Sequence, residues 1–255
     1  MIKIGIIKEY KIPNDFRTPL VPTQCKELNH SLNFNVKCQS SEIRCYNDEE
    51  YKNYGVQVVD NLQSCDVIFG IKEIPINKLL KNKTYFMFSH TIKKQPQNKK
   101  LLQTILKKNI RLIDYECLKK NNKRIIAFGK HAGIAGAYNT LIAYGIKNNL
   151  FVLKRLSHYK NTKALYKFGS TLKYRKPFKI LITGNGRVAK GVIELLESFN
   201  IKKVNKSSFI KQKFDYPIFC QISTKDYIKS KNGEKFSKND YYLFPNNFES
   251  NFNIF

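Results

Sequence analysis

Seven short, continuous apolar runs alternate with longer amphipathic segments. The runs, rich in β-branched and aromatic residues, are KIGII (3–7), NVKCQ (35–39), DVIFGI (66–71), TYFMFS (84–89), IRLID (110–114), RIIAFG (124–129) and KILIT (179–183). The segments expected to form helices are 18–31, 98–109 and 133–149. Unbroken apolar strands are typical of a parallel sheet whose two faces are covered by helices. The sequence therefore predicts an α/β fold.

The runs group into two Rossmann-like parallel-sheet domains. We expect a substrate-binding, catalytic domain over 1–140, a linking helix and crossover over 141–176, and a partial NAD(P)-binding Rossmann domain over 177–255. Only 77 residues lie from Lys179 to the last residue, whereas a complete dinucleotide domain needs about 100–150. The second domain is therefore predicted to be incomplete, and the chain to be truncated at its C-terminus.

Charge and composition exclude several classes of protein. The chain has 46 Lys and Arg against 19 Asp and Glu, a net charge of +27. The lysines are scattered among Asn, Ile and Tyr, which is typical of a solvated surface; clustering, not total charge, marks a nucleic-acid footprint. We therefore expect no specific nucleic-acid partner, although small anions would be attracted. No stretch approaches the roughly 20 apolar residues that cross a bilayer, and no signal peptide precedes the first strand. A cytoplasmic protein without a membrane partner is expected.

The six cysteines form no C-x-x-C pair and lie near no cluster of His residues. Reduced thiols are the simplest interpretation, and no metal site is predicted.

Polar residues follow the predicted strands of the first domain. Ligands of open parallel sheets bind at the carboxyl ends of strands. The side chains expected there are Arg17, Lys72, Glu73, His90, Lys93, Asp114 and Glu116. A single His after a strand is often only a solvated loop residue. A potential base, a potential acid and an anion-binding Arg on one edge favour a catalytic site.

The segment KILITGNGRVAKGVIELL predicts a strand, a glycine-rich turn and a helix. The turn fits G-x-G-x-x-A, and its residues are Gly184, Asn185, Gly186, Arg187, Val188 and Ala189. Such a turn lets the backbone and the helix N-terminus approach a pyrophosphate; the alternative is a glycine-rich turn without a ligand. The acidic residue expected about 20 positions later is missing. Asn205, Lys206 and Ser207 stand there instead, which slightly favours NADP over NAD.

Three segments together resemble a known family. TYFMFSHTIKKQPQN, IRLIDYECL and KRIIAFGKHAGIAGA are similar to the lysine-forming saccharopine dehydrogenases, especially to the lysine–2-oxoglutarate reductase portion of bifunctional aminoadipic semialdehyde synthase. KEYKIPNDFRTPLVP and GIKE fit the wider superfamily that includes alanine dehydrogenase and the N-terminal region of proton-pumping transhydrogenase.

The resemblance implies an NAD(P)H-dependent condensation of lysine with 2-oxoglutarate to saccharopine. It implies that Lys72 and His90 form the acid/base pair and that Arg17 clamps a carboxylate. Lys93 and Arg124 would make secondary contacts, while Glu73 and Glu116 would moderate the charge of the site.

Two alternatives remain open. Alanine dehydrogenase shares the Arg, Lys and His, although its His is typically followed by small apolar residues rather than TIKKQ. The second alternative is a truncated, catalytically impaired relative that acts as a binding or structural protein. Missing strands leave a sheet edge uncovered unless another chain covers it, so a homo-oligomer is kept as an option.

Overall fold

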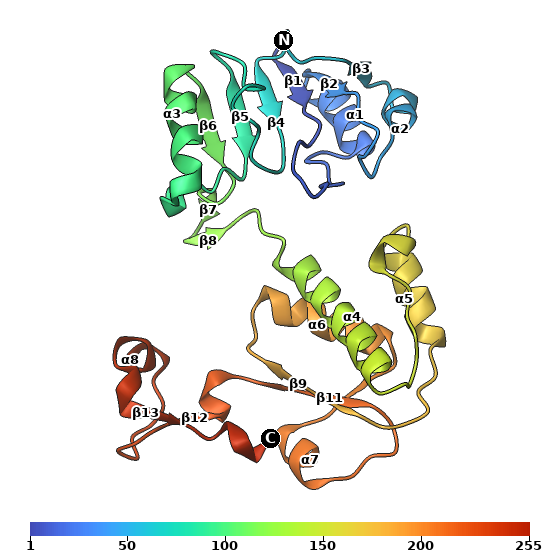
Figure 1. The fold of residues 1–255 in the computed structure, drawn as a ribbon, viewed down its shortest axis with the longest axis vertical. Helices are drawn as coiled ribbons and strands as arrows, with labels where there is room; N and C mark the ends of the chain where they lie inside the picture. The colour runs from blue at the N-terminus through green and yellow to red at the C-terminus, as the bar shows by residue number, and fades with distance from the viewer. The chain divides into compact units, whose positions relative to one another are not determined.

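The computed structural model describes all residues from Met1 to Phe255. It divides into two compact units, Met1–Ala127 and Phe128–Phe255 (Figure 1). This division falls before the boundary expected after residue 140, because helix α4 (Gly129–Lys147) packs closely on helix α6 (Arg187–Ser198) of the second unit. The expected α/β architecture is confirmed in both units.

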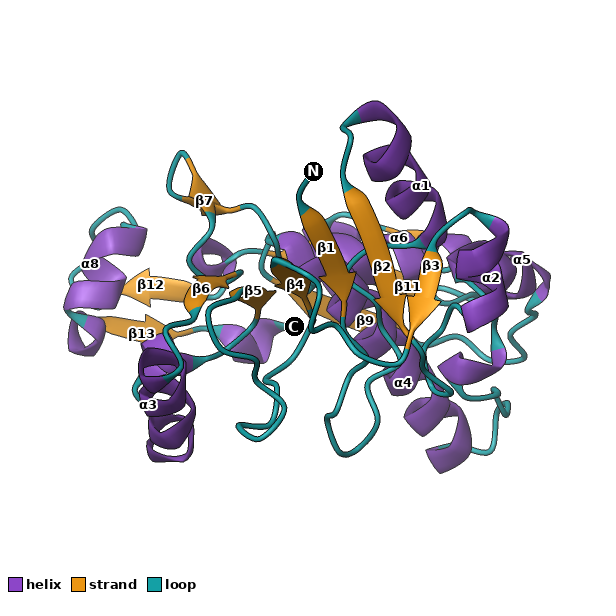
Figure 2. Ribbon diagram, turned by 90° about the horizontal axis from the view of Figure 1, so that it is seen from above, coloured by secondary structure: helices purple, strands orange, loops and turns teal.

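The first unit is built on a six-stranded sheet in the order β3-β2-β1-β4-β5-β6, and every pair in it is parallel. Figure 2 shows β1, β2 and β3 side by side. The strands are β1 (Lys3–Ile6), β2 (Asn35–Gln39), β3 (Gln57–Val59), β4 (Val67–Phe69), β5 (Thr84–Met87) and β6 (Arg111–Asp114). Strand β3, too short to produce a clear apolar run, was not anticipated.

Helices cover the sheet of the first unit. They are α1 (Pro22–Ser31), α2 (Asp48–Asn53), η1 (Thr91–Lys93), η2 (Pro96–Asn98) and α3 (Lys99–Lys107). The first helix starts later than expected from 18–31, with Pro22 in its first turn, where proline is tolerated. Helix α2 was not anticipated; Asn47 and Glu50 cap it reciprocally. One core contains Ile6, Cys38 and Tyr51, and another contains Ile68, Tyr85 and Leu101 from α3.

The run 124–129 was expected to be a strand, and this prediction is wrong. Instead β7 (Lys119–Lys120) and β8 (Lys123–Arg124) form a hairpin. Asn121 and Asn122 connect them with φ values of 50° and 57°, the left-handed pair that a tight two-residue hairpin turn requires. Ile125 is 60% exposed, so the apolar run does not enter a sheet.

The second unit has a three-stranded parallel sheet in the order β10-β11-β9. Its strands are β9 (Lys179–Thr183), β10 (Lys202–Lys203) and β11 (Ile218–Ile222), and β12 (Ile228–Ser230) pairs with β13 (Phe248–Ser250) in a separate hairpin. Besides α4 and α6 it contains η3 (Leu156–His158), α5 (Thr162–Thr171), α7 (Lys206–Lys211), η4 (Thr224–Asp226), α8 (Lys238–Leu243), η5 (Pro245–Asn247) and η6 (Phe252–Ile254). The expected crossover region thus contains a helix, α5.

Glycines let α4 and α6 approach each other closely. A Cβ added to Gly133 of α4 would lie 2.0 Å from the carbonyl oxygen of Val188. A Cβ added to Gly191 of α6 would lie 1.9 Å from the carbonyl oxygen of Lys130. Each helix therefore rests a glycine against the backbone of the other. None of the helices is long and apolar enough to cross a membrane.

Candidate active site

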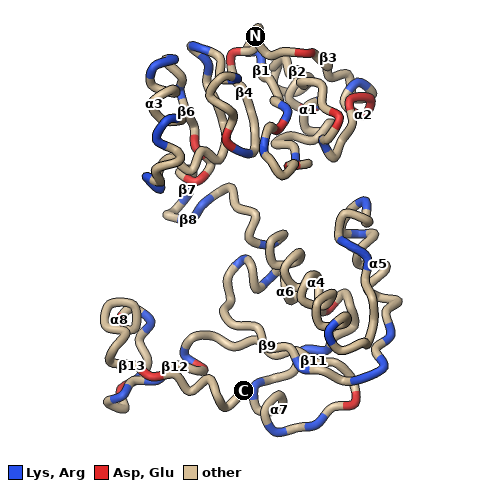
Figure 3. The backbone as a smooth tube through the Cα atoms, in the orientation of Figure 1, with Lys and Arg blue, Asp and Glu red and all other residues tan.

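The strand order brings the predicted polar loops to one edge. Strands β1, β4, β5 and β6 are neighbours and run in the same direction, so their carboxyl ends meet. The order of the strands reverses between β1 and β4, because β2 and β3 extend from one side of β1 and β4, β5 and β6 from the other; ligands of open α/β sheets bind at such a switch point. Figure 3 shows basic and acidic segments together along the edge where β4, β5 and β6 end.

His90 lies three residues after the end of β5, beyond the buried Phe88 and Ser89, and has a left-handed backbone, with φ 54°. Its Nδ1 is hydrogen-bonded to a carboxylate oxygen of Glu73, which follows β4. The His90 ring stacks beside Phe88, with 6.4 Å between ring centroids. Because Glu73 holds Nδ1, the ring is oriented and Nε2 is left for another partner.

Glu73 lies in a mixed environment. Burial alone would raise the pKa of its carboxyl, but the hydrogen bond from His90 and the nearby charges of His90 and Lys11 bring it below the usual value. The Lys11 ammonium is 3.8 Å from Oε2. That distance is an ion pair but too long for a hydrogen bond, and Oε2 is buried without a hydrogen-bond donor. Glu73 is thus a carboxylate with one oxygen still able to accept.

Glu116 repeats this arrangement at the end of β6. Its side chain is 7% exposed, and Oε1 lies 3.4 Å from the Lys93 ammonium and 3.5 Å from the Arg124 guanidinium. Its Oε2 is buried and accepts no hydrogen bond. A buried polar atom without a partner costs free energy. The two orphan oxygens of Glu73 and Glu116 can each accept a hydrogen bond from a further donor.

Asp114 organises the backbone around both loops. One of its oxygens accepts hydrogen bonds from the Ser89 amide, at 3.2 Å, and from the Ser89 hydroxyl. The other accepts the Glu116 amide at 2.8 Å. This buried carboxylate thus fixes the residue before His90 and the one that pairs with Lys93.

Arg17 is held by a carboxylate two residues before it. Its Nε lies 2.8 Å from Asp15 Oδ1, and Nη2 contacts the other oxygen. The hydrogen bond to Asp15 raises the pKa of Arg17, and the same bond lowers the pKa of Asp15, which the charge of Lys72 lowers further. The backbone amide of Lys72 donates to Glu9 at 2.9 Å.

Glu9, three residues after the end of β1, was not among the predicted site residues. It is buried, and its two oxygens accept the amides of Ile71 at 2.6 Å and Lys72 at 2.9 Å. Burial raises the pKa of Glu9, while these two hydrogen bonds oppose the increase. The signal in the sequence was an acidic residue near the end of an apolar run, as Asp114 is.

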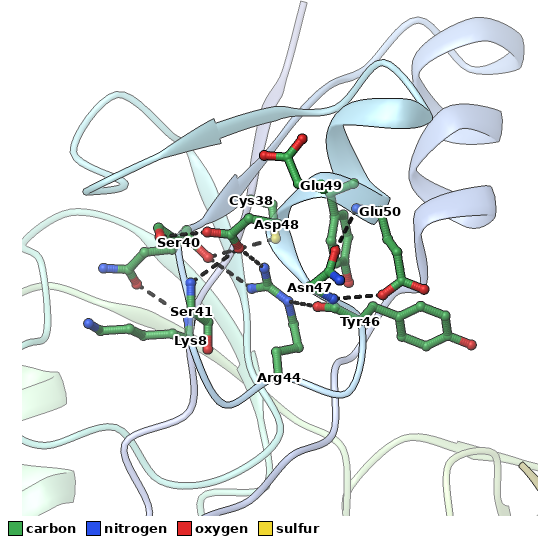
Figure 4. Close-up of polar contacts among 12 residues, drawn as sticks. Lys8, Cys38, Ser40, Ser41, Arg44, Tyr46, Asn47, Asp48, Glu49 and Glu50 are labelled. Carbon is green, nitrogen blue, oxygen red and sulfur yellow. Dashed lines mark hydrogen bonds and ion pairs between the residues drawn. The ribbon is translucent and has the colours of Figure 1, made fainter. Parts of the chain in front are cut away.

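A second polar cluster lies at the end of β2 (Figure 4). The buried Arg44 donates to Asp48 at 2.7 Å and to the Gln39 carbonyl at 2.8 Å, and it lies over the Tyr51 ring. Asp48 in turn accepts the Ser40 hydroxyl at 2.6 Å. This cluster holds the 40–48 loop beside an open hollow of about 540 Å³. The hollow lies on the β1–β2 side. Of the residues described above at the carboxyl ends of β1, β4, β5 and β6, only Glu9 lines it.

The glycine turn precedes α6 as the motif predicts. Gly184 has φ +87°, a conformation that favours glycine, and a Cβ at Gly184 or Gly186 would meet nothing within 4 Å. Gly186 is the N-cap residue of α6. It makes no side-chain hydrogen bond to the first amides of the helix. Ala189 is buried in the hydrophobic core of the second unit. The backbone of this turn thus has the open cradle that a pyrophosphate needs.

Asn205, Lys206 and Ser207, on which the preference for NADP was based, do not lie beside the glycine turn as the sequence predicts. Strand β11 lies between β10 and β9, so residues after β10 do not end a strand adjacent to the glycine turn. The Asn205 side chain caps α7 by accepting the Ser208 amide at 2.8 Å, and Lys206 pairs with Asp226 at 3.2 Å. The choice between NAD and NADP stays a prediction.

The model of the family described as alanine dehydrogenase/PNT, N-terminal domain, matches residues 5–135. The matched segment contains the second half of β1, all of β2 to β6 and every residue described above at the edge of the six-stranded sheet. This chain belongs to that family.

Curated relatives of this alanine dehydrogenase/PNT family member match beyond the N-terminal segment. α-Aminoadipic semialdehyde synthase from Mus musculus, named as mitochondrial, is 30% identical over an alignment of 263 residues, gaps included. The alignment covers 93% of this chain. Saccharopine dehydrogenase [NAD(+), L-lysine-forming] from Candida glabrata is 29% identical over 210 residues that cover 76% of the chain. The chain spans 28% of the length of the mouse protein and 56% of the Candida protein.

Solved structures agree with the fold of this family member. L-alanine dehydrogenase matches with a TM-score of 0.54 and 16% identity, covering 87% of this chain and 61% of that one. The transhydrogenase from Sinorhizobium meliloti matches with a TM-score of 0.55 and 17% identity, covering 80% and 58%. At these identities the similarity concerns the fold alone.

Within the family fold, the edge brings together most of the residues singled out from the sequence. Glu73 contacts His90, and Glu116 contacts both Lys93 and Arg124. Arg17 is held by Asp15, and the backbone amide of Lys72 is held by Glu9. No group of three or more His, Cys, Asp or Glu side chains is arranged to hold a metal ion, and all six cysteines are free.

Proposed function

We propose that this chain is an oxidoreductase of the lysine-forming saccharopine dehydrogenase type. It would condense the ε-amine of L-lysine with the keto carbon of 2-oxoglutarate and reduce the resulting imine to saccharopine. One proton and one water balance the reaction: the keto oxygen leaves as water, and the imine carbon accepts a hydride. The observation that carries this proposal is the oriented His90–Glu73 pair, with Lys72 next to Glu73 in the chain and its amide held by Glu9 at the same sheet edge.

Roles follow from chemistry and position. His90, with Nε2 available, would move protons at the carbinolamine and imine nitrogen, together with Lys72. Arg17 suits a carboxylate of 2-oxoglutarate, because guanidinium binds carboxylates bidentately. The orphan oxygens of Glu73 and Glu116 suit an amine donor. Gly184–Ala189 would hold the pyrophosphate of a nicotinamide dinucleotide, which when bound supplies the hydride.

Consumption of reduced dinucleotide tests the proposal. The purified chain is mixed with lysine, 2-oxoglutarate and either NADH or NADPH, and the nicotinamide absorbance is followed; turnover that requires both substrates is expected. His90→Asn is the negative control, and Asp215→Asn, an exposed substitution in the second unit, is the matched positive control. Absence of turnover with both dinucleotides would overturn the proposal.

An alanine dehydrogenase-like reaction is the second candidate, favoured by the match to the alanine dehydrogenase/PNT N-terminal family. The same assay with pyruvate and ammonia decides between the two substrates. A catalytically impaired binding protein is a third candidate, favoured by the three-stranded sheet of the second unit. It would bind 2-oxoglutarate or dinucleotide in calorimetry without turning over. Cytoplasmic location and self-association remain predictions beside this proposal.

A further inference from the structure

Glu9 stands where the ladder between β1 and β4 stops. The last backbone bond of that ladder runs from the Ile7 amide to the Phe69 carbonyl, at 2.9 Å. Beyond it, the amides of Ile71 and Lys72 face β1 without a backbone acceptor, and the Glu9 carboxylate takes both. A side chain therefore continues the pairing of the two strands by two more hydrogen bonds. Bonds to a charged acceptor are about twice as strong as neutral ones.

The surrounding backbone leaves room for this side chain. A Cβ added to Gly70 would lie 3.6 Å from Glu9 Oε1 and 2.9 Å from a methyl carbon of Ile7. Gly70 thus allows β1 and the carboxylate to approach the end of β4. Glu9 is only 9% exposed, so water offers these amides little alternative.

The contact extends to the histidine turn through the backbone. The carbonyl of Ile71, whose amide Glu9 binds, accepts the Phe88 amide at 3.0 Å. Phe88 is two residues before His90, while Glu73 is two residues after Ile71. One chain of hydrogen bonds therefore connects the ends of β1, β4 and β5. His90 and Glu73 each lie two residues from a member of this chain.

We infer that Glu9 is a positioning residue: its buried carboxylate fixes the backbone that carries Lys72 and Glu73 and, through Ile71, the turn that carries His90. This inference rests on the proposed function. It assigns Glu9 no contact with substrate. A displacement of about 1 Å at reacting groups can lower a rate about 100-fold, so the loss of this brace is expected to act on kcat.

Glu9→Gln tests the inference with little change in shape. The amide oxygen can accept one of the two backbone amides, but the amide NH₂ then faces the other donor. Asp66→Asn is the matched control, because Asp66 Oδ2 accepts the Lys3 amide at 2.9 Å at the opposite end of the same strand pair. We expect kcat to fall roughly 10- to 100-fold in Glu9→Gln, with the KM for dinucleotide unchanged, and Asp66→Asn to keep the wild-type kcat.

Hydrogen–deuterium exchange supplies a readout independent of turnover. In Glu9→Gln the amides of Ile71, Lys72 and Phe88 should exchange faster, while α1, α3 and the second unit keep their wild-type protection. Glu9→Asp, one methylene shorter and still charged, reaches only one amide and should show the same pattern more weakly. It also serves if Glu9→Gln does not fold.

The outcomes separate the two proposals. An inactive wild-type protein removes the proposed function, and the local exchange pattern in Glu9→Gln then still tests the brace. An active wild-type protein whose Glu9 variants retain wild-type kcat overturns the positioning role. Faster exchange throughout the first unit, with kcat and all KM values changed together, would also overturn it, because that indicates a general loss of structure.

Discussion

In Met1–Ala127 the loops at the sheet edge are held by buried carboxylates, whereas in Phe128–Phe255 the glycine turn before α6 is held by contact between two helix backbones. Asp114 and Glu9 each bind two backbone amides of loops that carry candidate catalytic residues. Gly133 and Gly191 instead allow the carbonyls of α4 and α6 to approach. The first arrangement depends on charge and hydrogen bonding, and the second depends on volume.

This difference fits the chemistry proposed for each region. Proton transfer needs groups whose pKa values respond to neighbouring charges, and the edge supplies them in contact with one another. A pyrophosphate needs an uncluttered backbone, which small residues supply. Substitutions of charge should therefore act mainly on the first unit, and substitutions of size mainly on the second.

The largest effect is expected from His90→Asn. Asparagine tolerates the left-handed backbone of residue 90, so stability should change little, while the imidazole is lost. A general acid–base contribution of about 10²–10⁴-fold corresponds to about 3–5 kcal/mol of barrier. Steady-state kinetics with saturating substrates measures kcat, and thermal unfolding checks the fold. A kcat within tenfold of wild type would remove His90 from the acid/base role.

Asp114→Ala should produce the next largest effect, on stability. It leaves the buried amides of Ser89 and Glu116 and the Ser89 hydroxyl without their acceptor, at a cost of about 2–4 kcal/mol. Denaturant unfolding measures the free energy, with the exposed Asp215→Ala as the control for removal of a carboxylate. If both variants lose equally little, carboxylates do not brace the edge.

The paired substitutions Gly133→Ala and Gly136→Ala test the dependence on volume. A methyl group at Gly133 would overlap the Val188 carbonyl, so a loss of about 1–3 kcal/mol is expected. Gly136 lies one turn along with nothing within 4 Å, so alanine there should stabilise α4 by about 0.5–1 kcal/mol. Equal losses in both variants would show that general helix effects, not the contact with α6, decide the result.

Much of the first unit could be predicted from the sequence because its signals are local. The strand 35–39 and, in the second unit, the strand 179–183 have the expected bounds. The residues after strands reach the edge because parallel strands share a direction, and this requires no knowledge of side-chain contacts. The run 124–129 misled, since a short apolar run looks alike in a strand and outside one. Asn121-Asn122 was the overlooked turn signal.

Other features depend on contacts that are distant in sequence. The periodicity of α4 indicates a buried face but not which sheet it covers, so its place in the second unit could not be read from it. The order β10-β11-β9 likewise depends on pairing, and it separates Asn205 and Lys206 from the glycine turn. The partner of Glu9 lies 62 residues away, beyond any local pattern.

The smallest expected effect is a pH-dependent one at Asp15, and it separates the two regions most cleanly. Arg17 lowers the pKa of Asp15 in the folded chain below its ordinary value of 3.8. The stabilisation from this pair is therefore fully present above pH 3.8 and is lost as the pH falls through the lower, folded pKa. Because the pair is partly exposed, Asp15→Asn should cost at most about 1 kcal/mol at neutral pH, and the difference from wild type should shrink in acid. The deficit of Gly133→Ala arises from overlap and should not change with pH. Unfolding free energies measured across that range compare both variants, and a deficit in Asp15→Asn that stayed constant into acid would show that charge does not hold Arg17.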